Sequence, residues 1–410
     1  MSDTEKKALC MSCFLLVIGL MGVDFFNPSL PYIMASLDVS QTSAKNLIVV
    51  YMLVLGVAQF FYGSFSDRHG RKPAILIGFA IAIVGLAGSA FSHSIGMLYL
   101  TRGVTAFGTA GCTVISRALI VDVFHEQRAL KKAFSYFAMS SQFSPAIAPL
   151  LGGAIQQYWG WQTSFAAFAL ITGLGLIFIV FGMSETHSPS GNRALSLRKV
   201  YAPYLTLLAN FKFMSYSIAS ALIFAFTIGY YATSPYAFHA LGYSPLINSL
   251  FYLAYSAAIL LGAWLMGSVF SGIRLHRLYL GSIIAYGALC LIALPLEISN
   301  SGLKIVVFSF FLGSICGVAA PLALVLSMSG VETNRGASSA LQGAIKMFFT
   351  GVFLVLFDAV SIVDFNSLIE VFMVFVLFLW VIFLMDFARE KRRRKSAAQL
   401  SAHASRRSIL

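Results

Sequence analysis

Charged residues are scarce in this chain: they make up 10% of its 410 residues, and only 15 of them are acidic. Hydrophobic residues make up 59%, and 37 of the residues are phenylalanine. A water-soluble globule could not keep so much apolar surface inside, because it would lack the polar side chains needed to cover it. The composition therefore excludes a soluble protein and indicates that a lipid bilayer is the solvent.

Cysteine is also scarce. The five cysteines are odd in number and lie in or beside apolar stretches, so no disulfide framework is expected. Cys10 and Cys13 form a C-x-x-C pair, but no second pair and no nearby histidine completes a metal site. We interpret both as small apolar residues at the start of the first helix.

Sequence patterns typical of enzymes are missing. The loops offer no nucleophile with a positioned base, no H-E-x-x-H metal pair and no phosphate-binding G-x-x-x-x-G-K stretch. A membrane enzyme or sensor is therefore disfavoured, and we expect neither a cofactor nor a metal.

Long apolar stretches fill the chain instead. Most reach 20 residues, which at about 1.5 Å per residue is enough to cross a hydrocarbon core of about 30 Å. The first carries Asp24, Asn27 and two prolines and has no small-residue cleavage site, so we expect a retained helix rather than a signal peptide. The predicted spans are residues 8–34, 46–66, 73–91, 95–121, 133–157, 162–183, 212–238, 246–270, 278–297, 303–329, 338–361 and 367–387.

The net charge of +13 is distributed unevenly. With the N-terminus in the cytoplasm, 23 of the 28 lysines and arginines fall in cytoplasmic segments. Lys45 and Lys304 fall outside, and Arg102, Arg117 and Lys346 lie within helices. This positive-inside pattern predicts that both termini lie in the cytoplasm. The membrane we expect is the bacterial inner membrane. The KRRRK run near the C-terminus fits an anchor at anionic lipid better than a nucleic-acid site.

The hydrophobic pattern breaks near the middle, at residues 184–203. A shift of 204 residues carries Gly63 onto Gly267 and Pro31 onto Pro235, which indicates two parallel repeats. Such repeats place a binding site near the membrane midplane, between halves that rock against each other. We predict an all-α membrane protein of two six-helix bundles, at 1–183 and 204–390, with a cytoplasmic linker at 184–203 and a basic tail at 391–410.

The loop after the second span reads GSFSDRHGRKP at residues 63–73. Gly70 suits a tight bend, Asp67 can accept hydrogen bonds at a helix N-terminus, and the cations favour the cytoplasmic side. The loop resembles the G-x-x-x-D-x-x-G-R-K signature of the major facilitator superfamily. In that family the acid caps the eleventh helix and latches the halves in the outward-open state. The alternative is a loop that only sets orientation.

The resemblance implies that the latch extends to the end of the fourth helix, where Asp122 is expected to face Arg71. At the equivalent second-half position Ser271 replaces the acid, so only one latch is expected. The predicted latch residues are Gly63, Asp67, Arg68, Gly70, Arg71, Arg117 and Asp122.

The first span contains DFFNPSLP at residues 24–31. A carboxylate in a spanning helix costs roughly 2.5 kcal/mol or more, so it usually faces the interior and is functional. The segment resembles the D-x-Y-x-P-x-x-P signature of the bicyclomycin and chloramphenicol resistance branch, with Phe26 in place of tyrosine. Asp24 is therefore a candidate proton carrier, and a purely structural hydrogen-bonding role is the alternative.

Arg102 is expected at the same depth as Asp24 and is its predicted partner. In the family this arginine belongs to an R-x-x-Q-G-x-G motif linked to proton coupling. The chain keeps Gly108 but has Thr105 and Ala106 where glutamine and glycine are usual.

The fifth span contains SPAIAPLLGG at residues 144–153. Prolines bend a helix and free its carbonyls, and paired glycines allow close backbone approach. The stretch resembles the antiporter motif of exporters, carried here by Pro145, Pro149, Gly152 and Gly153. The alternative is a plain kink with a packing groove.

The seventh span contains YYATSPY at residues 230–236 and resembles the Ser-Pro segment of the same branch. Its tyrosines suit the wall of a cavity for amphipathic ligands, although Tyr236 could equally anchor at the membrane interface. Lys346 lies too deep to reach water easily, so we expect it to contact either Gln59 or an anionic ligand. The predicted substrate-cavity residues are Asn27, Gln59, Gln142, Tyr230, Tyr231 and Lys346.

These features favour a proton-coupled exporter of small amphipathic compounds that works by alternating access, powered by the proton gradient. The alternative is a proton-coupled importer, or a metabolite or siderophore carrier, of the same fold. The expected partners are a small-molecule substrate, protons and the bilayer, with no nucleic acid, and the expected working unit is a monomer.

Overall fold

In the computed structural model of the chain, residues 2–186, 204–270, 272–329, 331, 335–359 and 364–407 are described. Every regular element among them is helical. The greater part of the predicted linker, residues 187–203, lies outside the described residues, as does Ser271. The described helices therefore fix the architecture on which the site is built.

The helices of the first half are α1 (Asp3–Asp24), η1 (Asn27–Ser29), α2 (Leu30–Ser36), α3 (Gln41–His69), α4 (Arg71–Ala90), α5 (Ile95–Val123), α6 (Gln127–Ser140), α7 (Phe143–Trp159) and α8 (Trp161–Gly182). Those of the second half are α10 (Phe211–Ala240), α11 (Pro245–Gly267), α12 (Leu275–Ala293), η2 (Leu294–Leu296), η3 (Ile298–Asn300), α13 (Gly302–Met328), α14 (Arg335–Ala359) and α15 (Phe365–Arg407).

Eleven helical segments in the described part of the chain are long and apolar enough to cross a bilayer. The remaining predicted span, the fifth, is divided into α6 with 14 residues and α7 with 17, each too short to cross alone. Together they complete the twelve predicted spans. The predicted all-α fold is thus confirmed, with the fifth span broken rather than continuous.

Both broken spans owe their shape to proline. The first span passes from α1 through the 3-10 turn η1 into α2, and Pro28 and Pro31 stand at the starts of the latter two elements. Proline lacks an N–H and cannot continue the hydrogen-bond pattern of a preceding helix. In the fifth span the chain turns at 141–142, and Pro145 follows in the first turn of α7. These two breaks lie where the site residues are found.

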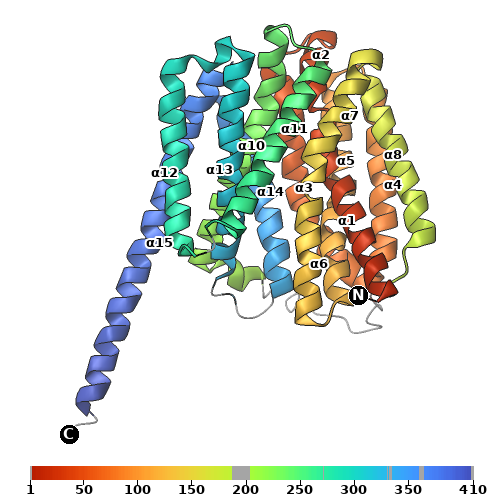
Figure 1. Ribbon diagram of the computed structural model, residues 1–410. Coiled ribbons are helices and arrows are strands. Elements are labelled where there is room, and N and C mark those ends of the chain that lie inside the picture. Colours follow the sequence, from red (N-terminus) through yellow and green to blue (C-terminus); the bar gives the residue numbers. More distant parts are fainter. Residues whose placement is uncertain are drawn as a thin grey trace.

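The two halves repeat the same helical pattern. A shift of 204 residues carries the first residues of α3 and α4, Gln41 and Arg71, onto Pro245 and Leu275, where α11 and α12 begin. One end of the chain departs from the prediction: α15 continues through Arg407, so the predicted tail extends the twelfth helix instead of following it. Figure 1 shows this extension leaving the bundle at the end where α1 begins.

The halves meet chiefly through two helix pairs, α3 with α14 and α7 with α11. In the first pair a Cβ added to Gly56 would lie 2.7 Å from the backbone nitrogen of Phe348, so only glycine permits this approach. The outward faces carry large exposed apolar side chains, such as Phe181 at 84% and Leu303 at 72% exposure. In a chain of this composition these faces are suited to contact lipid.

Candidate functional site

A cavity of about 180 Å³ lies between the two halves. Its walls come from α1, α7, α10, α11, α13 and α14, so every change in the relation of the halves alters it. Of the predicted cavity residues, it is lined by Gln142, Tyr231 and Lys346, and also by Asp24 and Pro145. Asn27, Gln59 and Tyr230 are buried but do not line it.

Asp24 is the last residue of α1 and is 6% exposed. Its Oδ2 accepts a hydrogen bond of 3.1 Å from the Ser144 hydroxyl, at the start of α7. The break in the first span and the break in the fifth thus bring the acid and the hydroxyl together. A carboxyl group on the wall of a cavity, held by one neutral donor, can take up and release a proton without losing its position.

Arg102 does not form the expected ion pair with Asp24. Its Nη2 donates a 2.9 Å hydrogen bond to the carbonyl oxygen of Gly22. The guanidinium carbon lies 4.0 Å from the centre of the Phe26 ring and 4.2 Å from that of Tyr51. Cation–π contacts of this kind stabilise a desolvated guanidinium by about 2 kcal/mol. Arg102 is therefore a clamp on the broken part of the first span rather than the counter-ion of Asp24.

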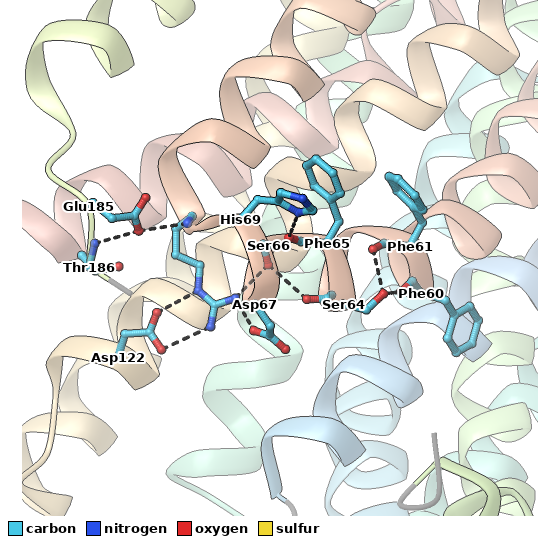
Figure 2. A network of polar contacts seen from close by, with 12 residues as sticks. Phe60, Phe61, Ser64, Phe65, Ser66, Asp67, His69, Asp122, Glu185 and Thr186 are labelled. Carbon is cyan, nitrogen blue, oxygen red and sulfur yellow. Dashed lines mark hydrogen bonds and ion pairs between the residues drawn. The ribbon is translucent and has the colours of Figure 1, made fainter. Parts of the chain in front are cut away.

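Arg71 is the centre of a polar network at the turn between α3 and α4 (Figure 2). Its Nε donates to Asp122 at 2.9 Å, and its Nη1 donates to Ser66 at 2.8 Å and to Asp67 at 2.5 Å. The structure thus brings together the end of α3, the start of α4 and the end of α5. Asp122 faces Arg71, as the resemblance implies.

Glu185 belongs to this network and was missed in the sequence, where it fell in the predicted linker. Its carboxylate accepts hydrogen bonds from the backbone N–H groups of Arg71 and Lys72, at 2.9 and 3.0 Å. It therefore caps the positive end of α4. Gly70 precedes that end at φ +97°, and a Cβ there would lie 2.6 Å from the Glu185 carboxylate. Only glycine fits both the backbone angle and the space.

Of the other predicted latch residues, Gly63 joins this network through its carbonyl oxygen, which accepts a 3.2 Å hydrogen bond from the Ser66 hydroxyl. Arg68 is exposed and has no hydrogen bond within the described chain. A Cβ added to Gly63 would lie 4.0 Å from the Tyr204 hydroxyl. Arg117 reaches the second half, where its Nη1 lies 2.5 Å from the position of a Cβ on Gly343. The expected contact of Asp67 with the first turn of the eleventh helix involves side chains at 332–337, which lie outside the described residues.

We expect Asp122→Ala to lower the free energy of unfolding by about 2 kcal/mol, because the buried Arg71 guanidinium then loses one of its two charged acceptors. Thermal melting of the purified protein in detergent measures the change. Lys6→Ala is the matched control, since its ion pair with Asp3 joins two exposed side chains and should contribute nothing measurable. Equal melting temperatures for Asp122→Ala and wild type would show that the network adds no stability.

The glycines of the fifth span let α7 pack closely against the end of α1 in its own half and against α11 of the other half. A Cβ on Gly152 would overlap the carbonyl oxygen of Phe25, beside Asp24. One on Gly153 would collide with Ser249 of α11 and lie 2.8 Å from the carbonyl oxygen of Pro245. Pro149 lies inside α7, and Pro145 lines the cavity. The same helix therefore carries the hydrogen-bond donor of Asp24 and part of the contact between the halves.

Tyrosines of α10 and α11 form a packed aromatic cluster. The rings of Tyr230 and Tyr255 stack with centres 4.6 Å apart, and the Tyr231 ring meets that of Tyr252 edge-on at 4.9 Å. Of these four, only Tyr231 lines the cavity. Tyr236 is 8% exposed, with Lys45 Nζ 5.7 Å from its ring centre, so it is packed between the halves rather than at a lipid interface.

Lys346 does not contact Gln59 through any hydrogen bond of the described chain. Its Nζ lies 4.5 Å from the centre of the Phe224 ring, on α10, and the side chain lines the cavity. Gln59 is 5% exposed on α3. Of the two contacts expected for Lys346, a hydrogen bond with Gln59 is not formed in the described part of the chain, and the lysine side chain lies in the cavity wall.

A second polar cluster was missed in the sequence. Asp386 of α15 accepts a 2.8 Å hydrogen bond from the Tyr216 hydroxyl of α10, and His276 Nε2 of α12 lies 3.5 Å from the same carboxylate oxygen. It joins three helices of the second half near the cytoplasmic end predicted from the charge bias. Within the described residues, no group of histidine, cysteine and acidic side chains could hold a metal ion.

Comparison with known proteins gives a family, relatives and a structural neighbour. A family model described as Major Facilitator Superfamily matches residues 12–353. The chain is 28% identical to Multidrug resistance protein D of Escherichia coli K12 over 84% of this chain and 86% of that one. It is also 28% identical to a bicyclomycin resistance protein homolog of Haemophilus influenzae, over 52% and 54% of the two chains. A solved D-xylose–proton symporter superposes with a TM-score of 0.70 over 92% of this chain and 96% of that one, at 16% identity, which shows a shared fold.

Proposed function

The chain belongs to the Major Facilitator Superfamily, a family of membrane transporters, and from that membership we propose that it is a proton-coupled exporter of small amphipathic compounds. The observation that carries the proposal is the position of Asp24: a buried carboxyl group on the wall of a cavity that both halves enclose. A group in that place can pass a proton from one side of the membrane to the other as the halves move.

In the proposed cycle, Asp24 takes up a proton when the cavity opens outward, and the halves then turn to open inward. The proton leaves toward the cytoplasm, and the substrate enters among the apolar side chains and the polar tips of Tyr231 and Gln142. Return to the outward-open state releases the substrate. Arg102 keeps the broken first span in shape throughout, and the Arg71 network latches the cytoplasmic side in one of the two states.

Export is favoured over uptake by the similarity to the two resistance proteins and by the glycines of α7. We place the protein in the bacterial inner membrane with both termini in the cytoplasm, on the basis of the positive-inside pattern. We assign 1–183 and 204–390 as its two bundles, 184–203 as the linker between them and 391–410 as the basic end of α15. We further propose that it works as a monomer, uses no cofactor and catalyses no chemical reaction.

The second candidate function is a proton-coupled importer, because neither Asp24 nor the latch fixes the direction of transport. Right-side-out and inverted membrane vesicles under an imposed pH gradient separate the two. With the vesicle interior acidic, inverted vesicles should accumulate a lipophilic test drug at least tenfold above vesicles without the protein. Accumulation only in right-side-out vesicles with an alkaline interior would instead identify an importer.

A further inference from the structure

The central cavity contains one acid and one base, and they are not paired with each other. Asp24 enters from α1 and accepts its hydrogen bond from Ser144. Lys346 enters from α14 and lies over the Phe224 ring. No ion pair or hydrogen bond within the described chain joins the Lys346 ammonium to an acceptor. The cavity therefore holds a cation with an aromatic neighbour and no charge partner.

A second cation lies next to the same stretch of α14. Arg117 of α5 packs against Gly343, where an added Cβ would be 2.5 Å from its Nη1. Gly343 and Lys346 are three residues apart, and residues at that spacing share one face of a helix. The part of the cavity wall formed by α14 therefore carries the Lys346 ammonium group. In a site of low dielectric such a wall attracts anions and repels cations.

The remaining walls of the cavity are mostly apolar. They are formed chiefly by Leu20, Val23, Ile223, Ile228, Ile259 and Met347. The polar groups that line the cavity away from α14 are few, and they include the Asp24 carboxyl group: Asp24, Ser141, Gln142, Thr227 and Tyr231. This arrangement fits a molecule with an apolar body and one charged end, held with that end toward Lys346.

We propose that the cavity selects amphipathic anions, in which a single carboxylate or sulfonate group pairs with Lys346 and the apolar body lies between α1 and α10. This inference rests on the proposed export function and narrows it to one substrate class. An anion gains a partner for a buried cation, whereas a neutral compound leaves that cation unpaired and a cation is repelled.

Three probes with one aromatic body test the proposal: naphthalene-2-sulfonate, naphthalene-2-sulfonamide and 2-naphthyltrimethylammonium. The sulfonate stays ionised at every pH used, so it does not leak through lipid as a neutral acid. Binding is measured by calorimetry on the purified full-length protein in detergent. We expect wild type to bind the sulfonate at least tenfold more tightly than the sulfonamide, and the ammonium compound more weakly than either.

Lys346→Met keeps an unbranched side chain only one atom shorter and removes its charge, so the tenfold preference for the sulfonate should fall to less than twofold. Lys346→Arg should retain most of the preference. Lys304→Met is the matched control, because Lys304 is exposed and donates to the carbonyl oxygen of Leu296 away from the cavity. It should show the wild-type preference. Equal binding of the three probes by wild type, or an unchanged preference in Lys346→Met, would overturn the inference.

Proteoliposomes with an imposed pH gradient separate this inference from the proposed function. If the sulfonamide or the ammonium compound is transported against its gradient while the sulfonate is not bound, the exporter stands and the anion selectivity is wrong. If the sulfonate binds with the Lys346-dependent preference but no probe moves when the pH gradient is applied, the selectivity stands and the proposed function is wrong.

Discussion

Asp24→Asn should abolish proton-driven accumulation while leaving substrate exchange intact. Asparagine has the same shape and can still accept the hydrogen bond from Ser144, so the local structure is kept. It cannot take up a proton, so the substitution removes the only cavity carboxyl group in the described chain. We expect accumulation under a pH gradient to fall to the level of protein-free liposomes, at least tenfold, with counterflow of labelled substrate within twofold of wild type.

Asp364→Asn is the matched control for this experiment. Asp364 precedes α15 outside the spanning segments, and its carboxylate accepts hydrogen bonds from Ser367 at 2.7 Å and Ser299 at 3.3 Å. Partial burial alone would raise the pKa of Asp364, but these hydrogen bonds outweigh it and hold that pKa below the usual range. Because its pKa is below the usual range, Asp364 is ionised at neutral pH and carries no proton. Its substitution should therefore leave coupling unchanged. Full accumulation by Asp24→Asn would remove Asp24 from the coupling scheme.

The spans and the position of Asp24 could be predicted from the sequence because both depend on hydrophobicity along one dimension. A stretch of about 20 apolar residues reports a crossing wherever its neighbours lie. The division of the fifth span was missed because apolar residues continue on both sides of the break. Hydropathy does not register a turn that is made by backbone geometry at 141–142.

Pairing between helices could not be predicted because depth in the membrane does not fix the direction in which a side chain points. Arg102 lies at the predicted depth and reaches Gly22, only two residues from Asp24. Two residues turn about 200° around a helix, so Asp24 points toward α7 instead. The expected ion pair is therefore absent because the Asp24 side chain points in another direction, although the two residues lie at the same depth in the membrane.

The same reasoning explains Lys346. α3 and α14 do adjoin, as expected, but Phe348 is the residue that meets Gly56. Lys346 precedes Phe348 by two residues and so faces away from α3 and Gln59, toward Phe224 and the cavity. The predicted pairing of the two helices is thus correct, whereas the predicted contact between Lys346 and Gln59 is wrong.

Glu185 and Asp386 were missed for a different reason. Each gains its partners from helices far away in the chain: Glu185 from the start of α4, and Asp386 from α10 and α12. The residues next to Glu185 and Asp386 in the sequence do not indicate that either acid belongs to a polar network. The signal that could have found them is the scarcity of acidic residues. In so apolar a chain, an acid near the end of a spanning helix is expected to form a hydrogen bond or an ion pair.

Gly152→Ala should reduce transport more than tenfold and lower the free energy of unfolding by about 1–3 kcal/mol, the usual range for overpacking. The added methyl group would occupy the place of the Phe25 carbonyl oxygen, which is backbone and cannot rotate away. α7 must therefore move away from α1. Because Ser144 belongs to α7, the same movement lengthens its 3.1 Å hydrogen bond to Asp24. Transport in proteoliposomes and melting in detergent measure the two effects.

Gly173→Ala is the control, because a Cβ at that position of α8 meets nothing within 4 Å. Alanine is the better helix former by up to about 1 kcal/mol, so this variant should be as stable as wild type or more so, and fully active. The pair separates the two interpretations of the fifth span. If the glycines serve packing alone, Gly152→Ala should lose stability and transport together and regain both in stabilising lipid. If α7 also positions the donor of Asp24, stability should return in lipid while the number of protons moved per substrate stays low, and recovery of both would contradict a coupling role for α7.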